Sequence, residues 1–518
     1  MLVHHFTEYY ARNFPDNPCL TQEERTTTYG DVDRLANQLA NGLLSLGVSR
    51  GDRVCTLGEN SLEHLLLFLA NCKIGAVSVS LNYRLAPVEL AFIIKDSQAR
   101  VLLMLDAGFQ ETLAALRPEL PEGVHLATRG LPDSLDWESW LAAQSTSRPN
   151  LKVTPDDACF QLYTSGTTGN PKGVITSHAN LVAEFVMNTA FMPTRPAPGS
   201  ADVVCAPMFH IGGAGSALVS TYAGAEIILH KAFDPAKVVA DIERYPVNSI
   251  FMVPAMIMAV LALPDIESRD FSGLQQIFYG ASPISEAVLR RAMEVFGVEF
   301  IQMYGMTETA GTVTNLTPAD HRAALAGRPE LLLSCGRPSV GVEIKIMNMD
   351  GEELPSGDVG EIWVKSDTNM LGYYNLPDAT ASSLTDGWVH TGDAGYVDEE
   401  GYLYLKDRIK DMVVSGGENI YPVEVENAIA HHEAVADVAV IGVPDEKYGE
   451  ALLAFVVTQS GKSLELEEMI GFCRERIAGY KIPRRLEIID EMPRNPSGKI
   501  LKKILRAPYW EGVDRAIG

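Results

Sequence analysis

Apolar positions follow two patterns along the chain, and the first covers about three quarters of it. Short runs of β-branched and other apolar residues alternate there with amphipathic stretches of helical spacing. Residues 32–46 have an apolar helical face and are followed by Gly47, a residue type that commonly ends helices. The predicted strands are 158–162, 249–253, 275–279 and 299–303, and further helices are expected from Asp234-Pro235 onward and at 285–296. This alternation indicates a mostly parallel sheet with helices on both faces.

The second pattern begins after about Leu331, where strands at 342–349, 361–365 and 402–405 are separated by tight turns and predict a barrel-like section. From about Asp411 a smaller α+β unit follows, with a helix after Pro422, strands at 435–443, 451–457 and 485–489, and a helix from Leu464. We therefore expect an α/β fold. It comprises a large N-terminal domain of helix-flanked sheets plus a distorted β-barrel (1–407), a hinge (408–411) and a small mobile C-terminal domain (412–518).

Charge and cysteine usage narrow the classes of protein. The 518 residues carry 42 Lys and Arg against 67 Asp and Glu, a net charge of −25, which disfavours nucleic acid and anionic membranes as partners. The longest apolar stretch, 250–264, is too short to span a bilayer and contains Pro254. The N-terminus lacks the features of a signal peptide. We therefore expect no membrane-spanning segment. Seven dispersed cysteines without a CxxC pair predict reduced, buried thiols in a cytoplasmic protein. The sequence leaves open whether the protein forms a homodimer.

The segment Tyr163–Gly173, YTSGTTGNPKG, has the composition of a phosphate-binding loop and is expected between the strand 158–162 and a helix near Asn180. Backbone N–H groups and hydroxyls of such a loop can surround phosphate oxygens, with a lysine as the cation. The loop is not a Walker A motif, because Pro171 stands where that motif needs a glycine. The alternative for its composition alone is a flexible surface turn. The candidate phosphate-binding residues are Thr164, Ser165, Gly166, Thr167, Thr168, Gly169 and Lys172.

Seven further segments follow this loop in order along the chain: PMFHIGG (207–213), YGAS (279–282), YGMTET (304–309), TGD (391–393), DRIKD (407–411), SGGENIYPVEVE (415–426) and PRNPSGKI (493–500). Together with the loop they resemble the adenylate-forming superfamily of acyl-CoA synthetases, peptide-synthetase adenylation domains and luciferase-like enzymes. The resemblance implies an acid–CoA ligase. ATP activates a carboxylic acid as an acyl-adenylate with release of pyrophosphate, and the acyl group then passes to coenzyme A with release of AMP.

The resemblance also assigns roles around the nucleotide. Thr307 would bind a phosphate oxygen, and Glu308 would hold Mg²⁺ against the phosphates. The adenine would lie between an aromatic face and a small-residue edge, and the ribose hydroxyls between a carboxylate and a guanidinium. Without the family resemblance, each of these residues would be interpreted as a turn, packing or surface residue. The residues of the base and ribose sites are Tyr304, Gly305, Gly280, Ala281, Ser282, Asp393 and Arg408.

Lys499 matches the family's catalytic lysine, which would bridge the substrate carboxylate and the α-phosphate. Taken alone, the basic tail around it would be a solvated run of charge. Because Lys499 lies on the small domain, the resemblance implies a rotation that brings it in for adenylation and removes it for thioester formation. Lys410 would be at the hinge, and the approach of the thiol would be lined by Gly416, Gly417 and Asn419.

The acid itself is less well specified. His210 matches the family's gate between the acyl pocket and the thiol tunnel, and its position holds an aspartate in adenylation domains for amino acids. An acid without an α-amino group, fatty or aryl, is therefore favoured. Glycines at 212, 213, 215, 280, 305 and 311 fit either a roomy acyl slot or close backbone packing. Two alternatives stay open: an acyl-AMP ligase that loads a carrier protein, and a catalytically silent nucleotide-binding regulator.

Overall fold

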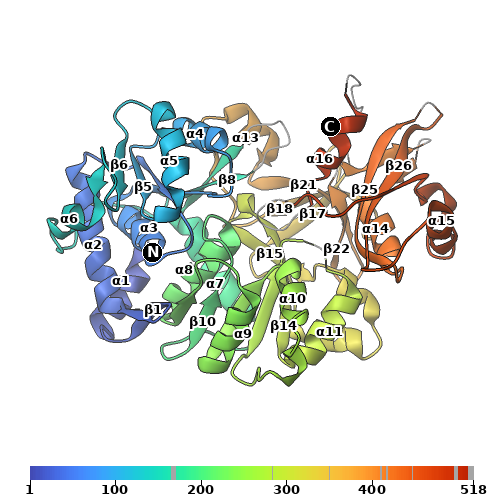
Figure 1. Cartoon of the computed structure of the whole chain (residues 1–518), viewed down its shortest axis with the longest axis horizontal. Coiled ribbons are helices and arrows are strands. Elements are labelled where there is room, and N and C mark those ends of the chain that lie inside the picture. The colour runs from blue at the N-terminus through green and yellow to red at the C-terminus, as the bar shows by residue number, and fades with distance from the viewer. Residues whose placement is uncertain are drawn as a thin grey trace.

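The protein is described by a computed structural model that covers residues 1–164, 171–282, 284–348, 350–408, 411–415, 418–445, 447–494 and 500–511. Two large sheets and two five-stranded sheets make up the fold (Figure 1). Along the longest axis, the C-terminal elements α14–α16 and β25–β26, orange to red, lie at the end opposite α1 and α2, in blue. None of the helices in these ranges combines the length and apolar character that crossing a bilayer requires.

An eight-stranded sheet has the order β19-β9-β8-β4-β3-β5-β6-β7, parallel from β8 to β7. Alternate residues of its strands point to opposite faces: Val101 and Leu103 pack with α2 and α3, whereas Leu102 and Met104 pack with α4 and α5. The strands are β3 (Arg53–Leu57), β4 (Val77–Leu81), β5 (Val101–Met104), β6 (His125–Thr128), β7 (Leu135–Asp136), β8 (Ala158–Thr164), β9 (Lys172–Ser177) and β19 (Gly372–Tyr373). The helices are α2 (Tyr29–Ser45), α3 (Leu62–Ile74), α4 (Pro87–Asp96), α5 (Gln110–Leu116) and α6 (Trp137–Ala142).

A nine-stranded sheet has the order β16-β15-β14-β13-β12-β10-β11-β1-β2 and is parallel from β14 to β1. Helices α9, α10 and α11 cover one face, and α7 and α8 lie in the core shared with the eight-stranded sheet. The strands are β1 (Pro18–Gln22), β2 (Arg25–Thr28), β10 (Ala201–Val204), β11 (Glu226–Leu229), β12 (Val247–Met252), β13 (Gln276–Gly280), β14 (Glu299–Met306), β15 (Gly311–Leu316) and β16 (Arg337–Pro338). The helices are α1 (His4–Asn13), α7 (His178–Phe191), α8 (Ile211–Ala223), α9 (Pro235–Arg244), α10 (Pro254–Leu261), α11 (Glu286–Phe296) and α12 (Pro318–Leu325).

The predicted barrel-like section is an antiparallel five-stranded sheet in which β22 pairs with β21. Its elements are β17 (Glu343–Met347), β18 (Gly360–Lys365), α13 (Pro377–Ser383), β20 (Leu384–Thr385), β21 (Trp388–Val397) and β22 (Leu403–Arg408). The C-terminal sheet has apolar clusters on both faces. Its elements are β23 (Val413–Ser415), β24 (Glu418–Ile420), α14 (Pro422–Ala430), β25 (Val435–Asp445), β26 (Gly449–Thr458), α15 (Leu466–Arg474), β27 (Arg485–Ile488) and α16 (Lys502–Arg506). The predicted fold class is therefore confirmed.

Local signals explain where several helices begin. As expected from the sequence, Asp234 accepts hydrogen bonds from the N–H groups of Ala236 and Lys237 at the start of α9. Ser285, the first residue of the predicted helix 285–296, caps α11. The helix expected near Asn180 is present as α7. The structure adds a strand that the sequence did not predict, because β9 lies between the candidate phosphate loop and α7 and pairs antiparallel with β8. The loop therefore joins the two strands of a hairpin.

Candidate active site

The candidate base site lies at the carboxyl ends of the parallel strands β13 and β14, the edge at which open α/β sheets commonly bind ligands. Gly280 ends β13, and a Cβ there would lie 2.1 Å from the carbonyl oxygen of Met303. Ala281 follows with a φ of 67°, a conformation that residues with a Cβ rarely adopt. Gly280 is thus required by close strand packing, and the strained turn after it presents Ala281 and Ser282 at the strand edge.

A tight turn follows β14 and presents Thr307 and Glu308. A Cβ on Gly305 would lie 1.7 Å from the carbonyl oxygen of Gly311, so β14 and β15 approach closely just before the turn. The Thr309 hydroxyl accepts from the N–H of Met306 at 3.2 Å and lies 2.9 Å from the carbonyl oxygen of Gly311. Glu308 is 7% exposed, and Thr307 is partly exposed. The turn thereby holds a hydroxyl and a carboxylate side by side.

Tyr304 and Asp393 connect two different sheets. The Tyr304 hydroxyl, at the end of β14, donates to Asp393 Oδ2 on β21 at 2.8 Å. Both side chains are buried, and the N–H of Asp393 donates to the hydroxyl of Thr391 at 3.1 Å. Arg408 lies opposite Asp393 in the antiparallel pair of β21 with β22. The predicted base-stacking and ribose-binding residues are therefore brought together from the nine-stranded sheet and the barrel-like sheet.

Glu308 has a partner that sequence reasoning missed. The Tyr373 hydroxyl, on the short strand β19, donates to Glu308 Oε1 at 2.9 Å. Lys172 Nζ lies 4.8 Å from the centre of the Tyr373 ring, which is cation–π geometry. Thr164 faces Lys172 across the β8–β9 hairpin. Tyr373 therefore connects the Glu308 carboxylate with Lys172, at one end of the candidate phosphate loop. Ser165, Gly166, Thr167, Thr168 and Gly169 lie outside the described residues.

His210 is the residue before α8, and its ring lies 4.9 Å from the ring of Phe209, which packs in turn on Tyr83. The glycines of this region serve different purposes. A Cβ on Gly213 would lie 2.2 Å from the carbonyl oxygen of Pro207, so that glycine is required by packing. A Cβ on Gly215, in contrast, would meet no atom of the described residues within 4 Å and would face open space.

The C-terminal candidates are only partly described. Lys410, Gly416, Gly417 and Lys499 lie outside the described residues, and Asn419 is described through its backbone, which pairs with Val414. The tail after Lys499 is not a fully solvated run of charge. Arg506 Nη2 lies 2.6 Å from Asp411 Oδ1, and Lys502 Nζ lies 2.8 Å from Glu426 Oε1. These ion pairs attach the start of α16, at Lys502, to α14 and its last residue, Arg506, to the region of the predicted hinge.

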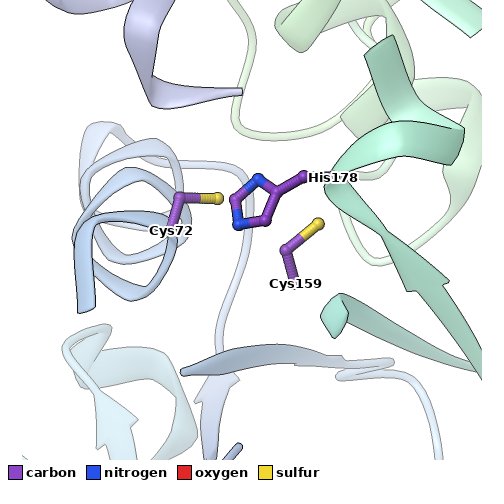
Figure 2. A group of neighbouring side chains, drawn as sticks. All are labelled: Cys72, Cys159 and His178. Carbon is purple, nitrogen blue, oxygen red and sulfur yellow. The ribbon is translucent and has the colours of Figure 1, made fainter. Parts of the chain in front are cut away.

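The fold brings together one group that the cysteine spacing did not predict. Cys72, Cys159 and His178 are fully buried, with their potential ligand atoms within 4.8 Å of one another (Figure 2). The Val3 N–H donates to His178 Nδ1 at 3.3 Å, which leaves the proton of the neutral ring on Nε2 and no ring nitrogen free for a metal. Burial lowers the pKa of His178 to about 4 and raises that of the Cys159 thiol. We therefore assign this group to core packing.

An acid-activating ligase is the class of enzyme that this fold and site define, and comparisons with known proteins support it. The sequence matches the AMP-binding enzyme family over residues 7–374 and the AMP-binding enzyme C-terminal domain over 424–499. The chain therefore belongs to the AMP-binding enzyme family. This membership and the ligases among its relatives confirm the predicted class, an AMP-forming acid–CoA ligase that uses ATP and CoA.

Three similar proteins illustrate the range of the family. The fatty acid–acyl-carrier-protein ligase ScoC of Streptomyces coeruleorubidus is 39% identical over 99% of this chain and 97% of its own length. The feruloyl-CoA synthase of an Amycolatopsis species is 38% identical over 96% of this chain and 97% of its own. The structure of o-succinylbenzoate CoA synthetase from Bacillus subtilis, in complex with its acyl-adenylate, has a TM-score of 0.85 and 30% identity over 99% of this chain and 98% of that chain.

Proposed function

We propose that the described site binds ATP and a fatty or aryl carboxylic acid and that the named residues carry out adenylation there. The observation that supports this most directly is the convergence of Tyr304, Asp393, Glu308 and Lys172 at one strand edge, although they come from three sheets. A sheet edge of this kind places an aromatic face, two carboxylates and a cation around one ligand volume.

The nucleoside would be held by the Tyr304–Asp393 pair. The Tyr304 ring offers a face for adenine, beside the small residues at 280–282. Its hydroxyl already donates to one Asp393 oxygen at 2.8 Å, which orients the carboxylate so that it can accept from the ribose hydroxyls. Arg408, opposite Asp393 in the strand pair, would donate from the other side.

The residues present fit Mg²⁺ at Glu308. Mg²⁺ prefers oxygen ligands, commonly one or two carboxylates together with substrate phosphates. The Glu308 carboxylate is largely buried and is held at Oε1 by Tyr373, which connects it with Lys172 at one end of the candidate phosphate loop. When bound, the ion would neutralise negative charge on the phosphates. Thr307 would donate its hydroxyl to a phosphate oxygen, and Lys172 would contribute positive charge from the start of β9.

The reaction has two half-reactions whose atoms balance. A carboxylate oxygen of the acid attacks the α-phosphorus of ATP, and the bond to the β-phosphate oxygen breaks, giving an acyl-adenylate and pyrophosphate. The thiol of CoA then attacks the acyl carbonyl carbon, loses its proton, and releases AMP. Because attack brings two anions together, Lys499 would stabilise the developing charge between the carboxylate and the α-phosphate. His210 would separate the acyl group from the approach of the thiol.

The thioester step also requires Lys499 to leave. We infer a hinge at 408–411 between an N-terminal domain (1–407) and a C-terminal domain (412–518), with Lys410 in the hinge and Gly416, Gly417 and Asn419 along the path of the thiol. The Arg506–Asp411 and Lys502–Glu426 ion pairs would stabilise the C-terminal segment that carries Lys499. A carrier protein is the second candidate acceptor, because the ScoC relative is a fatty acid–acyl-carrier-protein ligase.

Pyrophosphate release from ATP and Mg²⁺ tests the proposed function. The panel contains short, medium and long fatty acids, branched acids, benzoates and cinnamates, each with and without CoA. We expect release that depends on the acid and turns over repeatedly only with CoA. Release that stops after one turnover despite CoA would favour the carrier-protein acceptor. ATP binding without release for any acid would contradict the proposal in favour of a silent regulator.

A further inference from the structure

Glu184 is a buried carboxyl group on α7 that has no ion-pair partner among the described residues, and its side chain is only partly satisfied. The residue is 4% exposed. Its Oε1 atom accepts from the Thr312 N–H at 2.9 Å and from Asn188 Nδ2 at 2.7 Å. Its Oε2 atom and the Oδ1 atom of Asn188 are both buried without a hydrogen-bond partner in the described part of the chain. Buried polar atoms rarely lack a hydrogen-bond partner, so this pair is a candidate binding site for a polar group.

The pair lies against the backbone of the candidate site. Gly311 has a φ of 135°, and a Cβ there would lie 2.4 Å from Glu184 Oε1. Gly311 and Thr312 pair with Met306 and Gly305, directly before Thr307. The carboxyl group of Glu184 therefore packs directly against β15, the strand that pairs with β14 just before the turn of Thr307 and Glu308.

The same pair lies on a helix that packs against the helix following His210. Helices α7 and α8 and strand β15 pack on one another pairwise, and α8 follows directly after His210. Gly215, one turn into α8, faces open space. The Glu184–Asn188 face thus belongs to the same packing layer as the helix that follows His210, the residue proposed to separate the acyl group from the thiol.

The protonation of Glu184 decides what the pair can bind. Burial raises the pKa of Glu184 to about 8, so the carboxyl group is mostly protonated at neutral pH. Protonated Glu184 then offers an O–H donor at Oε2, while Asn188 offers an acceptor at Oδ1. A hydroxyl group both donates and accepts a hydrogen bond, so its chemistry matches both atoms.

We propose that Glu184 and Asn188 form a specificity-determining pair that binds a hydroxyl group on the acyl part of the acid substrate. The preferred acid is then a hydroxylated fatty or aryl acid and not its unsubstituted counterpart. This inference rests on the proposed function, because it takes acid activation as given and adds which acid is favoured. The competing occupant of the pair is an ordered water molecule.

The test compares kcat/KM for matched acids in pyrophosphate release: cinnamate against its ring-hydroxylated derivatives, and fatty acids of one length with and without a hydroxyl group. The wild-type protein is expected to favour the hydroxylated member of one pair by roughly tenfold or more. Glu184→Gln keeps a donor and should retain most of this ratio. Glu184→Leu removes the donor and Asn188→Leu the acceptor, and each should lower the ratio by roughly tenfold.

Asp202→Asn is the matched control, because Asp202 is a buried carboxylate on β10 whose oxygens accept from Ser220 and Ser249 at 2.7 Å each. The Asp202→Asn variant should prefer the hydroxylated acid by the same ratio of kcat/KM values as the wild type. Should Glu184→Leu fail to fold, Asn188→Leu carries the same comparison. Acid activation with no preference for any hydroxylated acid, or a preference unchanged by both leucine variants, would overturn the inference in favour of a bound water. The absence of activation with every acid would instead overturn the proposed function.

Discussion

The hydroxyl of Tyr373 donates a hydrogen bond to Glu308 Oε1 at 2.9 Å, although the two residues are 65 positions apart in the chain. The contact joins the β8–β9 hairpin, on which β19 packs, to the turn after β14. It therefore connects the candidate phosphate loop with the candidate magnesium ligand. A carboxylate that is already oriented does not need to be ordered when the metal–nucleotide complex binds.

Tyr373→Phe is expected to raise the apparent KM for MgATP roughly tenfold, because it removes one hydrogen bond to a charged group. Tyr374→Phe is the matched control, since the hydroxyl of Tyr374 donates to Gln98 at 3.1 Å and contacts no candidate site residue among those described. Titration of ATP and Mg²⁺ in the pyrophosphate assay measures both variants. Equal effects of the two substitutions would contradict the assignment of Tyr373 to the phosphate site.

Tyr304→Phe keeps an aromatic ring for the base but removes the hydroxyl that orients Asp393. We expect the KM for ATP to rise roughly tenfold and the discrimination between ATP and 2′-deoxy-ATP to shrink. Tyr402→Phe is a close control, because its hydroxyl donates to another carboxylate, Asp320, at 2.6 Å. A loss of discrimination in both variants, or in neither, would remove Asp393 from the ribose site.

Lys499→Ala is expected to slow adenylation by roughly 10²-fold or more, because the charge developing at the α-phosphate loses its cation. Thioester formation from supplied acyl-adenylate and CoA should be affected much less. The exposed Lys503 lies on the same basic tail, so Lys503→Ala is the control for overall charge. An equal loss of both half-reactions in Lys499→Ala would argue against two alternating domain poses.

Glu184 makes stability depend on pH in a specific direction. Its pKa of about 8 in the folded protein exceeds the ordinary value of 4.5, so the folded state binds an additional proton between these values. Stability therefore falls as the pH rises from about 4.5 to about 8 and loses nothing further above that. Glu184→Gln removes this dependence.

The stabilisation by Glu184→Gln, measured by urea unfolding, should thus grow with pH between 5 and 8 and then level off. The pKa shift corresponds to a gain on the order of 5 kcal/mol at pH 8. Burial also raises the pKa of Asp202, whose oxygens accept hydrogen bonds from Ser220 and Ser249, so Asp202→Asn should show a pH dependence in the same direction and serves as a second buried carboxyl group for comparison. A difference between Glu184→Gln and the wild type that does not vary with pH would show that Glu184 is not buried in its neutral form.

The elements that the sequence predicted well carry strong local signals. Asp234 caps α9 as expected, the helix predicted at 285–296 is present as α11, and the strands at 275–279 and 299–303 lie next to each other in a parallel sheet. The relation of Tyr304 to Asp393 was implied only by the family resemblance, because no local pattern connects residues in two sheets. Their assignment to base and ribose stays a prediction.

What the sequence did not predict depends on pairing between distant segments. Strand β9 was missed because Lys172–Ser177 is short and stands directly before a helix, and only its pairing with β8 and β19 identifies it. The contact of Tyr373 with Glu308 was missed because Tyr373 lies on β19, another short strand that is identified only by its pairing with β9. From the sequence, the glycines at 213, 280, 305 and 311 fitted either an acyl slot or close backbone packing. Neighbouring atoms lie so near to these glycines that close packing is the explanation.

The measurement that tests the central claim most directly follows an oxygen atom. The candidate acid, labelled with ¹⁸O in its carboxylate, is incubated with ATP, Mg²⁺ and CoA, and the products are analysed by mass spectrometry. Attack on the α-phosphorus leaves a carboxylate oxygen on the phosphate after thiolysis, so each acyl-CoA should be accompanied by AMP that carries one ¹⁸O atom. Label in orthophosphate together with ADP, or acyl-CoA formed with unlabelled AMP, would contradict an acyl-adenylate and with it this account of the site.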